Sequence, residues 1–327
     1  MSLDATSPPR PTRVVFLGSG AFGGPTLEAL VADPGFEVVL VATPPDRPAG
    51  RRRRPTPVPI ATIAERLELP VLRTEDCNRE GDLASIEAAA PDALVVIAFG
   101  QKLGPHLRGI AFAINLHASL LPAFRGAAPI QRALMAGARV TGLSVISLAE
   151  RMDAGAVHAR RETEIGVAET AGELHDRLAA MGPEAILETL RRHRSGELAS
   201  EVQEESLATR APKIRREDAV VDFTRSARCL RGWIHGLSPR PGCTISVDGE
   251  SLRLLRVGVV EDGDAPPREG DDDAVPPGTL VERDLLRCGE GWLRPLEVQP
   301  AGGRAMTWEA WRRGRPTLVL PTGVASP

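Results

Sequence analysis

Near its N-terminus the chain alternates apolar runs with a glycine-rich turn and a helical pattern, and this alternation limits the folds that it can adopt. Residues 13–18 read RVVFLG, a helix-like segment follows the glycines, and a second apolar run, EVVLVAT, ends at Thr43. A strand, a helix and a second strand in this order form a βαβ unit with parallel strands. Further apolar runs at residues 92–100 and 109–118 continue the pattern. The sequence therefore predicts an α/β domain with a mostly parallel sheet and helices on both of its faces.

The second half of the chain has a different pattern. Residues 197–214 are polar and aperiodic, which predicts a linker. Beyond them, short β-like runs such as TISVDG and LRLLRVGVV alternate with Gly, Pro and Asp turns, the pattern of a small β barrel or sandwich. We expect a disordered lead-in over residues 1–12, an α/β domain over 13–196, the linker, and a β-rich domain over 215–320 that contains an acidic, solvated loop at 261–273.

Composition narrows the class of protein. The chain has 327 residues, enough for two domains, and its formal net charge of −3 means that a nucleic acid would have to be bound by a local basic patch. Its four cysteines include no CxxC pair, which argues against a zinc site or a dense disulfide framework and favours a reducing cytoplasm. No apolar run reaches the roughly 18 residues of a membrane helix, and the first residues lack the apolar centre of a signal peptide.

Gly18, Gly20 and Gly23 spell GxGxxG between the first strand and the first helix, the position of a dinucleotide-binding turn. An NAD-binding domain would place an acidic residue at the end of its second strand to bind the ribose, whereas this strand ends in Thr43. An arginine after that strand could bind the 2′-phosphate of NADP, so an NADP-dependent oxidoreductase stays open. We interpret the glycines as residues that let the first helix pack closely on the sheet.

Two polar residues end the apolar run at 109–118. Asn115 and His117 are two positions apart, so on an extended strand their side chains point to the same side. The carboxyl end of a strand in an open α/β sheet is also where ligands bind. An amide and an imidazole would thus face one reacting centre, although such a pair is common and also compatible with a structural role.

The residues around this pair carry a resemblance to a known family. The segment INLHASLLPAFRGAAPIQRALMAG resembles the signature of the methionyl-tRNA formyltransferase family, which belongs to the enzymes that use 10-formyltetrahydrofolate as a one-carbon donor. PPDRPAGRRRRPTPVPIATIAERLELPV is similar to the family's basic loop and following helix, MDAGAV to its acidic loop, and VQPAGGRAMTWEAW to its C-terminal part. The resemblance runs from Arg13 to Trp311 with matching order and spacing.

This resemblance implies an enzyme that formylates the α-amino group of methionine on initiator methionyl-tRNA, for use in translation initiation. It implies a Rossmann-like formyltransferase domain followed by an OB-like β barrel that binds the tRNA. The family's catalytic residues fall on Asn115, His117 and Asp153, and its folate-contacting tetrapeptide falls on Ser119, Leu120, Leu121 and Pro122. We expect a cytoplasmic monomer that needs no metal and takes 10-formyltetrahydrofolate as its co-substrate.

These residue types suit the reaction. When a primary amine attacks a formyl carbon, the formyl oxygen gains negative charge and the nitrogen must lose a proton. The Asn115 amide and the His117 imidazole can donate hydrogen bonds to that oxygen, and one preorganised donor lowers the barrier by roughly 3–4 kcal/mol. Asp153 follows after a helix and a strand, so it can return to the same site, orient the imidazole and offer a route for the proton.

Basic residues are candidates for binding the tRNA. A run of arginines is often simply solvated. In the basic loop of this family resemblance we interpret it as a binding site for tRNA phosphates, since arginine pairs bidentately with phosphate. The predicted tRNA-binding residues are Arg47, Arg51, Arg52, Arg53, Arg54 and Lys213. Aromatic residues make up only 3% of the chain, so backbone electrostatics rather than base stacking should carry most of the affinity for RNA.

Four alternatives stay open. Two belong to the same group of enzymes, namely a formyltransferase acting on an amino-sugar nucleotide and the folate hydrolase domain of formyltetrahydrofolate dehydrogenase. The β-rich half with its QPAGGRAM segment and the arginine loop favour tRNA over both. The other two are the NADP-dependent oxidoreductase and a non-catalytic RNA-binding module.

Overall fold

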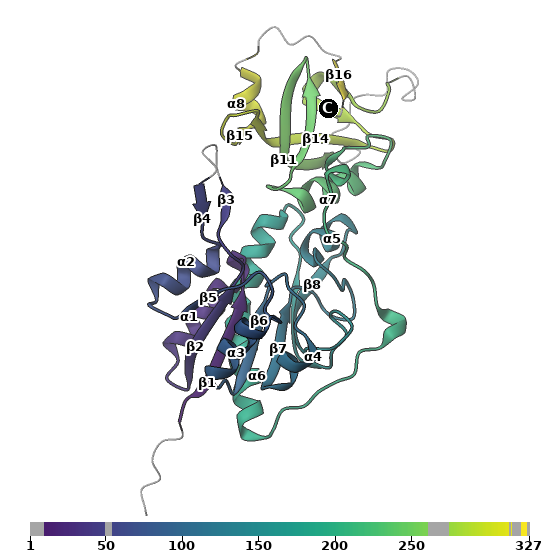
Figure 1. Cartoon of the computed structure of the whole chain (residues 1–327). Helices are drawn as coiled ribbons and strands as arrows, with labels where there is room; N and C mark the ends of the chain where they lie inside the picture. The colour runs from purple at the N-terminus through teal and green to yellow at the C-terminus, as the bar shows by residue number, and fades with distance from the viewer. Residues whose placement is uncertain (1–9, 50–53, 261–274, 314, 316–321, 326–327) are drawn as a thin grey trace, which may run out of the picture. The chain divides into compact units, whose positions relative to one another are not determined.

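The computed structural model describes residues 10–49, 54–260, 275–313, 315 and 322–325 (Figure 1). The chain forms two compact units. The first contains Met1–Arg125, Gly142–Glu162 and Asp176–Arg210, and the second contains Gly126–Thr141, Thr163–His175 and Ala211–Pro327. Each unit therefore combines stretches that lie far apart in the sequence.

The first described residues already pack on the first unit. The Arg10 guanidinium donates to both carboxylate oxygens of Asp92, at 2.8 Å each, and Thr12 begins the first strand. Residues 1–9 of the expected lead-in and residues 261–273 of the expected acidic loop lie outside the described part of the chain. For those residues the sequence-based expectations stay predictions.

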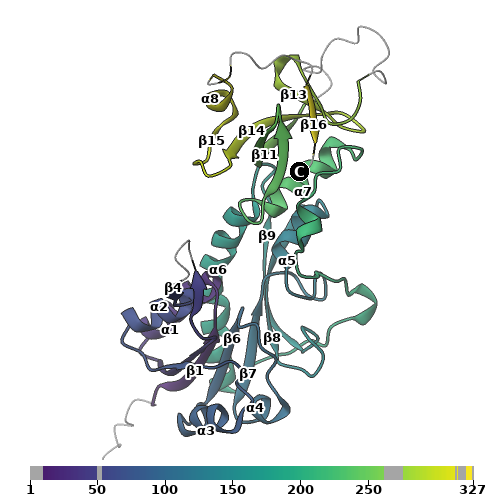
Figure 2. The same ribbon diagram turned by 45° about the horizontal axis from the view of Figure 1, so that its top comes forward.

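A seven-stranded sheet with the order β5-β2-β1-β6-β7-β8-β9 forms the centre of the first unit, as Figure 1 and Figure 2 show. Its strands are β1 Thr12–Gly18, β2 Phe36–Thr43, β5 Val71–Arg73, β6 Ala93–Ile97, β7 Phe112–His117, β8 Val140–Ser147 and β9 Val157–Glu164. The pairs from β5 to β7 are all parallel, and β8 runs antiparallel to β7. The predicted α/β domain with a mostly parallel sheet is confirmed.

Helices cover both faces of this sheet. The helices and the short hairpin beside them are η1 Ala21–Gly23, α1 Gly24–Ala32, β3 Arg47–Ala49, β4 Arg54–Thr56, α2 Pro59–Arg66, α3 Glu80–Ala88, α4 Pro105–Gly109 and α6 Ala171–Ser195. Val15 and Leu17 of β1 share one core cluster with Ile86 of α3 and Leu107 of α4. Phe16, between them, points to the opposite face because side chains alternate along a strand.

Two of the three GxGxxG glycines have a packing reason. A Cβ on Gly18 would lie 2.8 Å from Phe16 Cε1, and a Cβ on Gly23 would lie 3.0 Å from Phe16 Cζ and 3.3 Å from Ile60 Cδ1 of α2. The first helical turn can therefore lie close to the sheet only where these side chains are missing. A Cβ on Gly20 would meet open space, so the packing interpretation holds for Gly18 and Gly23 alone.

In the second unit an antiparallel sheet closes into a ring. β11 pairs with β10, β10 with β16, β16 with β12, β12 with β13, β13 with β14, and β14 again with β11. The strands are β10 Cys243–Val247, β11 Glu250–Val260, β12 Thr279–Val281, β13 Leu285–Arg287, β14 Trp292–Pro300, β15 Met306–Thr307 and β16 Thr322–Ala325. This confirms the expected OB-like β barrel.

The second unit also contains a helix that the sequence did not predict. Ser226 caps the N-terminus of α7 (Ala227–Leu237), because its Oγ accepts a hydrogen bond from the backbone amide of Cys229. The helix packs on α5 (Pro129–Met135). A Cβ on Gly232 of α7 would lie only 2.5 Å from the carbonyl oxygen of Leu134, so the two helices touch through their backbones. The remaining elements are η2 Glu205–Leu207 in the first unit and α8 Trp308–Arg313, η3 Arg216–Ala219 and η6 Glu282–Asp284 in the second.

Among the described residues, none of the helices combines the length and the apolar character needed to cross a membrane.

Candidate active site

Asn115 and His117 lie at the carboxyl end of β7, where the strand runs between β6 and β8. Asn115 pairs in register with Val96 of β6 and Ile146 of β8. Since the two residues occupy alternate positions of one strand, their side chains share one face of the sheet. Asn115 is partly exposed, and no group in the described part of the chain forms a hydrogen bond with its carboxamide. Its N–H groups are therefore available to a ligand.

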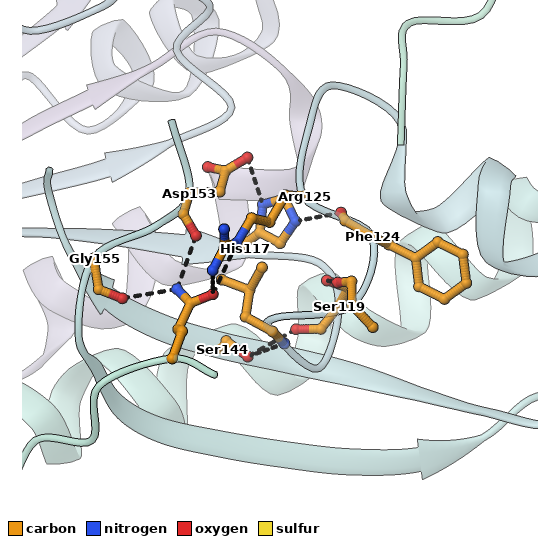
Figure 3. Close-up of polar contacts among 10 residues, drawn as sticks. His117, Ser119, Phe124, Arg125, Ser144, Asp153 and Gly155 are labelled. Carbon is orange, nitrogen blue, oxygen red and sulfur yellow. Dashed lines mark hydrogen bonds and ion pairs between the residues drawn. The ribbon is translucent and has the colours of Figure 1, made fainter. Parts of the chain in front are cut away.

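The His117 imidazole is buried, with the residue 6% exposed, and both ring nitrogens face polar groups (Figure 3). Nε2 lies 2.9 Å from the carbonyl oxygen of Phe124. Because a carbonyl oxygen only accepts, Nε2 carries a proton and donates. Nδ1 lies 3.8 Å from Oδ2 of Asp153. The structure thus brings His117 and Asp153 together and turns Nδ1 toward the carboxylate.

The two residues that flank the imidazole have an unusual backbone. Asp153, in the loop between β8 and β9, has φ 54°, and Phe124 has φ 58°. A left-handed conformation costs a residue other than glycine about 1–3 kcal/mol, so the surrounding structure has to hold it in place. Gly155 lets the Asp153 loop lie against the end of β8, because a Cβ there would be 1.7 Å from the carbonyl oxygen of Ser147.

Residues 201–210, in the segment expected to be a linker, form hydrogen bonds with the backbone at Asp153 and at Phe124. The Gln203 side-chain nitrogen donates to the carbonyl oxygens of Asp153, at 2.8 Å, and Gly155, at 2.7 Å. Its oxygen accepts from Nε and Nη2 of Arg125, at 3.0 and 2.8 Å. Through these contacts of Gln203, the segment packs against the loop of Asp153 and against Arg125.

Arg125 connects this segment to the other side of His117. Its Nη1 donates to both carboxylate oxygens of Glu205, at 2.8 and 3.0 Å, and this guanidinium holds the pKa of Glu205 below its usual value. The Phe124 amide donates to Oγ1 of Thr209 at 2.8 Å, and the Arg125 amide donates to the carbonyl oxygen of Thr209 at 2.9 Å. Gln203, Glu205 and Thr209 were missed from the sequence because polar, aperiodic residues carry no pattern that reveals such contacts.

The segment from Ser119 to Pro122 is held from inside the protein. Ser144 of β8 donates its hydroxyl to the carbonyl oxygen of Ser119 at 2.8 Å and accepts from the amide of Leu121 at 3.0 Å. The Ser119 hydroxyl donates to the carbonyl oxygen of Ala123 at 2.6 Å. Ser119 and Leu121 are 0% and 1% exposed, so only the partly exposed Leu120 and Pro122 offer side-chain surface in this segment.

The structure describes only part of the basic loop. Arg47 is exposed and pairs with Thr56 in the β3–β4 hairpin. Arg51, Arg52 and Arg53 lie outside the described residues, and Arg54 is described only as a residue of β4. Lys213 is exposed and belongs to the second unit, where its carbonyl oxygen accepts from Arg132. No group of three or more His, Cys, Asp or Glu residues suited to a metal ion occurs among the described residues.

Two family models match the chain. The model described as formyl transferase matches residues 12–190, and the model described as formyl transferase, C-terminal domain, matches residues 213–316. The methionyl-tRNA formyltransferase of Chlorobium luteolum is 39% identical over 317 residues, which cover 94% of this chain and 99% of that protein. The methionyl-tRNA formyltransferase of Heliobacterium modesticaldum is 39% identical over 310 residues, which cover 93% of this chain and 97% of that protein.

A solved structure shares the fold. HypX from Aquifex aeolicus, in complex with tetrahydrofolic acid, matches with a TM-score of 0.58 at 17% identity, over 93% of this chain and 47% of that one. The likeness therefore spans about half of HypX and at this identity concerns the fold alone. The two family models and the close relatives, which match over almost their whole lengths, place this chain in the methionyl-tRNA formyltransferase family.

Proposed function

We propose that this enzyme transfers the formyl group of 10-formyltetrahydrofolate to the α-amino group of methionine on initiator methionyl-tRNA, giving N-formylmethionyl-tRNA. Membership of the family supports the reaction class. The observation that carries the proposal is the arrangement of Asn115, His117 and Asp153, in which an available amide lies on the same strand face as an imidazole that adjoins a carboxylate. With charged tRNA as the acceptor, the proposed location of the reaction is the cytoplasm.

Asn115 is the proposed donor to the formyl oxygen. 10-Formyltetrahydrofolate supplies the formyl group, whose oxygen becomes more negative as the amine attacks. A preorganised N–H donor needs no rearrangement to stabilise that charge, and it contributes roughly 3–4 kcal/mol. The absence of a partner for the Asn115 carboxamide among the described residues supports this role.

His117 and Asp153 are the proposed proton-handling pair. Because Nε2 of His117 donates to the carbonyl oxygen of Phe124, exchange with the site has to occur at Nδ1, on the side of Asp153. The α-amino group of the substrate is partly neutral at cellular pH, with a pKa of about 7.7–8.0, so it needs only modest help from a base. We propose that Asp153 accepts the proton that the amine loses and returns it to N10 of tetrahydrofolate as the bond between N10 and the formyl carbon breaks. His117, oriented by Asp153, is the proposed second donor near the formyl oxygen.

The remaining binding roles follow the family resemblance. Ser119, Leu120, Leu121 and Pro122 are proposed to contact the folate; the burial of Ser119 and Leu121 favours contact through the backbone and through Leu120 and Pro122. Arg47, Arg51, Arg52, Arg53, Arg54 and Lys213 are proposed to bind tRNA phosphates, and the exposure of Arg47 and Lys213 is compatible with this.

The test is the transfer of a labelled formyl group from 10-formyltetrahydrofolate, with four parallel reactions. The acceptors are charged initiator methionyl-tRNA, free methionine, an amino-sugar nucleotide, and none. Label on the charged tRNA alone is the expected result. Label on the sugar nucleotide, or formate released without an acceptor, would retain the chemistry but overturn the proposed substrate, and no folate turnover would overturn the proposal altogether.

A further inference from the structure

The side chain of Gln203 satisfies every hydrogen-bonding position that it has. Its nitrogen donates to the carbonyl oxygens of Asp153 and Gly155, and its oxygen accepts two N–H groups of Arg125. The residue is 7% exposed. Since carbonyl oxygens only accept and a guanidinium only donates, these partners permit one orientation of the amide. The Gln203 amide therefore has a single orientation, in which its nitrogen binds two carbonyl oxygens of one loop.

That loop is the one that carries Asp153. Its backbone is left-handed at Asp153, a conformation that an aspartate holds only when its surroundings favour it. Gln203 binds the carbonyl of Asp153 itself and the carbonyl two residues later, so it holds both ends of the short turn. The carboxylate of Asp153 lies 3.8 Å from Nδ1 of His117, and a change in the turn would alter this separation.

Arg125 connects Gln203 with the opposite side of the His117 imidazole. It directly follows Phe124, whose carbonyl oxygen accepts from Nε2 of His117 and whose backbone is also left-handed. Phe124 and Arg125 are in turn held by Thr209, six residues beyond Gln203 in the same segment. Both residues that orient the ring are thus anchored to one stretch of chain.

We infer that Gln203 is a positioning residue, which acts on catalysis through Asp153 by fixing the loop that presents its carboxylate to His117. The inference rests on the proposed function, because it assumes that Asp153 handles the proton. A merely structural role for Gln203 would instead affect stability and leave the catalytic step unchanged.

Three variants separate these roles. Gln203→Met keeps the length of the side chain and removes both donors and the acceptor. Gln203→Glu keeps an acceptor for Arg125 and removes the donors to the loop. Gln101→Met is the matched control in the same unit, because the Gln101 amide bridges the backbone of Cys77 and Thr74 in a comparable way.

Steady-state formyl transfer and thermal unfolding are measured for each. A loop carboxylate displaced by about 1 Å can slow a reaction by up to a hundredfold, so we expect kcat to fall at least about tenfold in both Gln203 variants, with the KM for tRNA and for folate changing less than about twofold. Gln101→Met should lose comparable stability and keep its kcat. Should Gln203→Met fail to fold, Gln203→Glu decides the point, since it retains the pairing with Arg125.

A double-mutant cycle with Asp153→Ala completes the test. If Gln203 acts through Asp153, adding Gln203→Met to Asp153→Ala should lower kcat by less than about twofold further, because coupled residues are not additive. Full kcat in Gln203→Met and Gln203→Glu, or an additive loss in the double variant, overturns the positioning role while the proposed function stands. Full kcat in Asp153→Ala, or no formyl transfer by the unaltered enzyme, overturns the proposed function and the positioning role with it.

Discussion

Nε2 of His117 lies 2.9 Å from the carbonyl oxygen of Phe124, and this contact determines which ring nitrogen can serve the reaction. A carbonyl oxygen only accepts, so Nε2 is committed as a donor. Nδ1 is turned toward Asp153 at 3.8 Å. Nδ1 is therefore the ring nitrogen through which we propose that His117 serves the reaction, and the orientation of the ring depends on the backbone at Phe124 as much as on the carboxylate.

Asp153→Asn should lower turnover by at least about a hundredfold, because it preserves the shape of the side chain and removes the base next to Nδ1. Binding of folate and tRNA should stay nearly unchanged. The check is single-turnover formyl transfer together with equilibrium binding of each substrate. Asp82→Asn, on α3 and bonded to Thr74, is the control and should keep full activity. Turnover like that of the unaltered enzyme in Asp153→Asn would remove Asp153 from the mechanism.

Asn115→Ala removes the proposed donor to the formyl oxygen. Without one preorganised donor, kcat should fall by about a hundredfold to a thousandfold, and the substrate KM values should change little because the donor acts on charge that develops during the reaction. Asn115→Asp should be at least as slow, since it opposes that charge with another. A kcat in Asn115→Ala within a few fold of the unaltered enzyme would contradict the role.

Replacing Arg51, Arg52, Arg53 and Arg54 by alanine should weaken tRNA binding and flatten its dependence on salt. For every phosphate that the variant no longer neutralises, the slope of log K against log salt should decrease by about 0.7–0.9. Binding is measured between low and moderate salt, and Arg79→Ala, an exposed arginine before α3, serves as the control. An unchanged slope of log K against log salt would show that the loop arginines are simply solvated and do not bind tRNA phosphates.

His235 should make the stability of the enzyme depend on pH. It is 2% exposed, its Nε2 accepts from the amide of Val257, and burial lowers its pKa from 6.5 to about 4. Between these values the unfolded chain binds a proton that the folded protein excludes, so stability is complete above about pH 6.5 and falls as the pH drops toward 4. The full effect approaches about 3 kcal/mol.

The measurement is urea unfolding of the unaltered enzyme and of His235→Gln across this range of pH. The variant is less stable at every pH because a buried contact is changed, but the free energy of unfolding should fall less steeply with acid. Parallel pH profiles for the two proteins would show that His235 does not titrate as expected.

Gly155→Ala should destabilise the enzyme and slow it as well. The added Cβ would lie 1.7 Å from the carbonyl oxygen of Ser147, so the loop of Asp153 has to move. Overpacking of this kind costs about 1–3 kcal/mol or more. Gly20→Ala, where a Cβ meets open space, should be close to neutral in thermal unfolding. Equal melting temperatures for the two variants would contradict the predicted close approach.

The main elements of the fold could be predicted from local pattern. The apolar runs at residues 92–100 and 109–118 form β6 and β7, and the segments TISVDG and LRLLRVGVV form β10 and most of β11. α7 was missed, since its glycines at 232 and 236 serve contact with α5 rather than helix formation. Such a contact depends on a helix about a hundred residues earlier in the chain, which no local period can reveal.

The candidate site also contains residues that the sequence could predict and residues that it could not. That Asn115 and His117 share a strand face follows from their spacing, and the roles assigned to them came with the family resemblance. The contribution of Gln203 does not follow from either, because Arg125 and Gln203 are 78 positions apart and meet only in the folded chain. Residues 201–210 look like a linker in sequence because hydrogen-bonding side chains without apolar periodicity resemble solvent-exposed chain.

The sequence by itself determined the α/β and β-rich halves, the strand that presents Asn115 and His117, and the resemblance to a family, because apolar periodicity and short motifs depend on neighbouring residues. Only the tertiary structure decided that Nε2 of His117 is committed to Phe124, that Asp153 adopts a left-handed backbone, and that Gln203 holds its loop. Those features depend on hydrogen bonds between distant segments, whose direction and length exist only once the chain has folded.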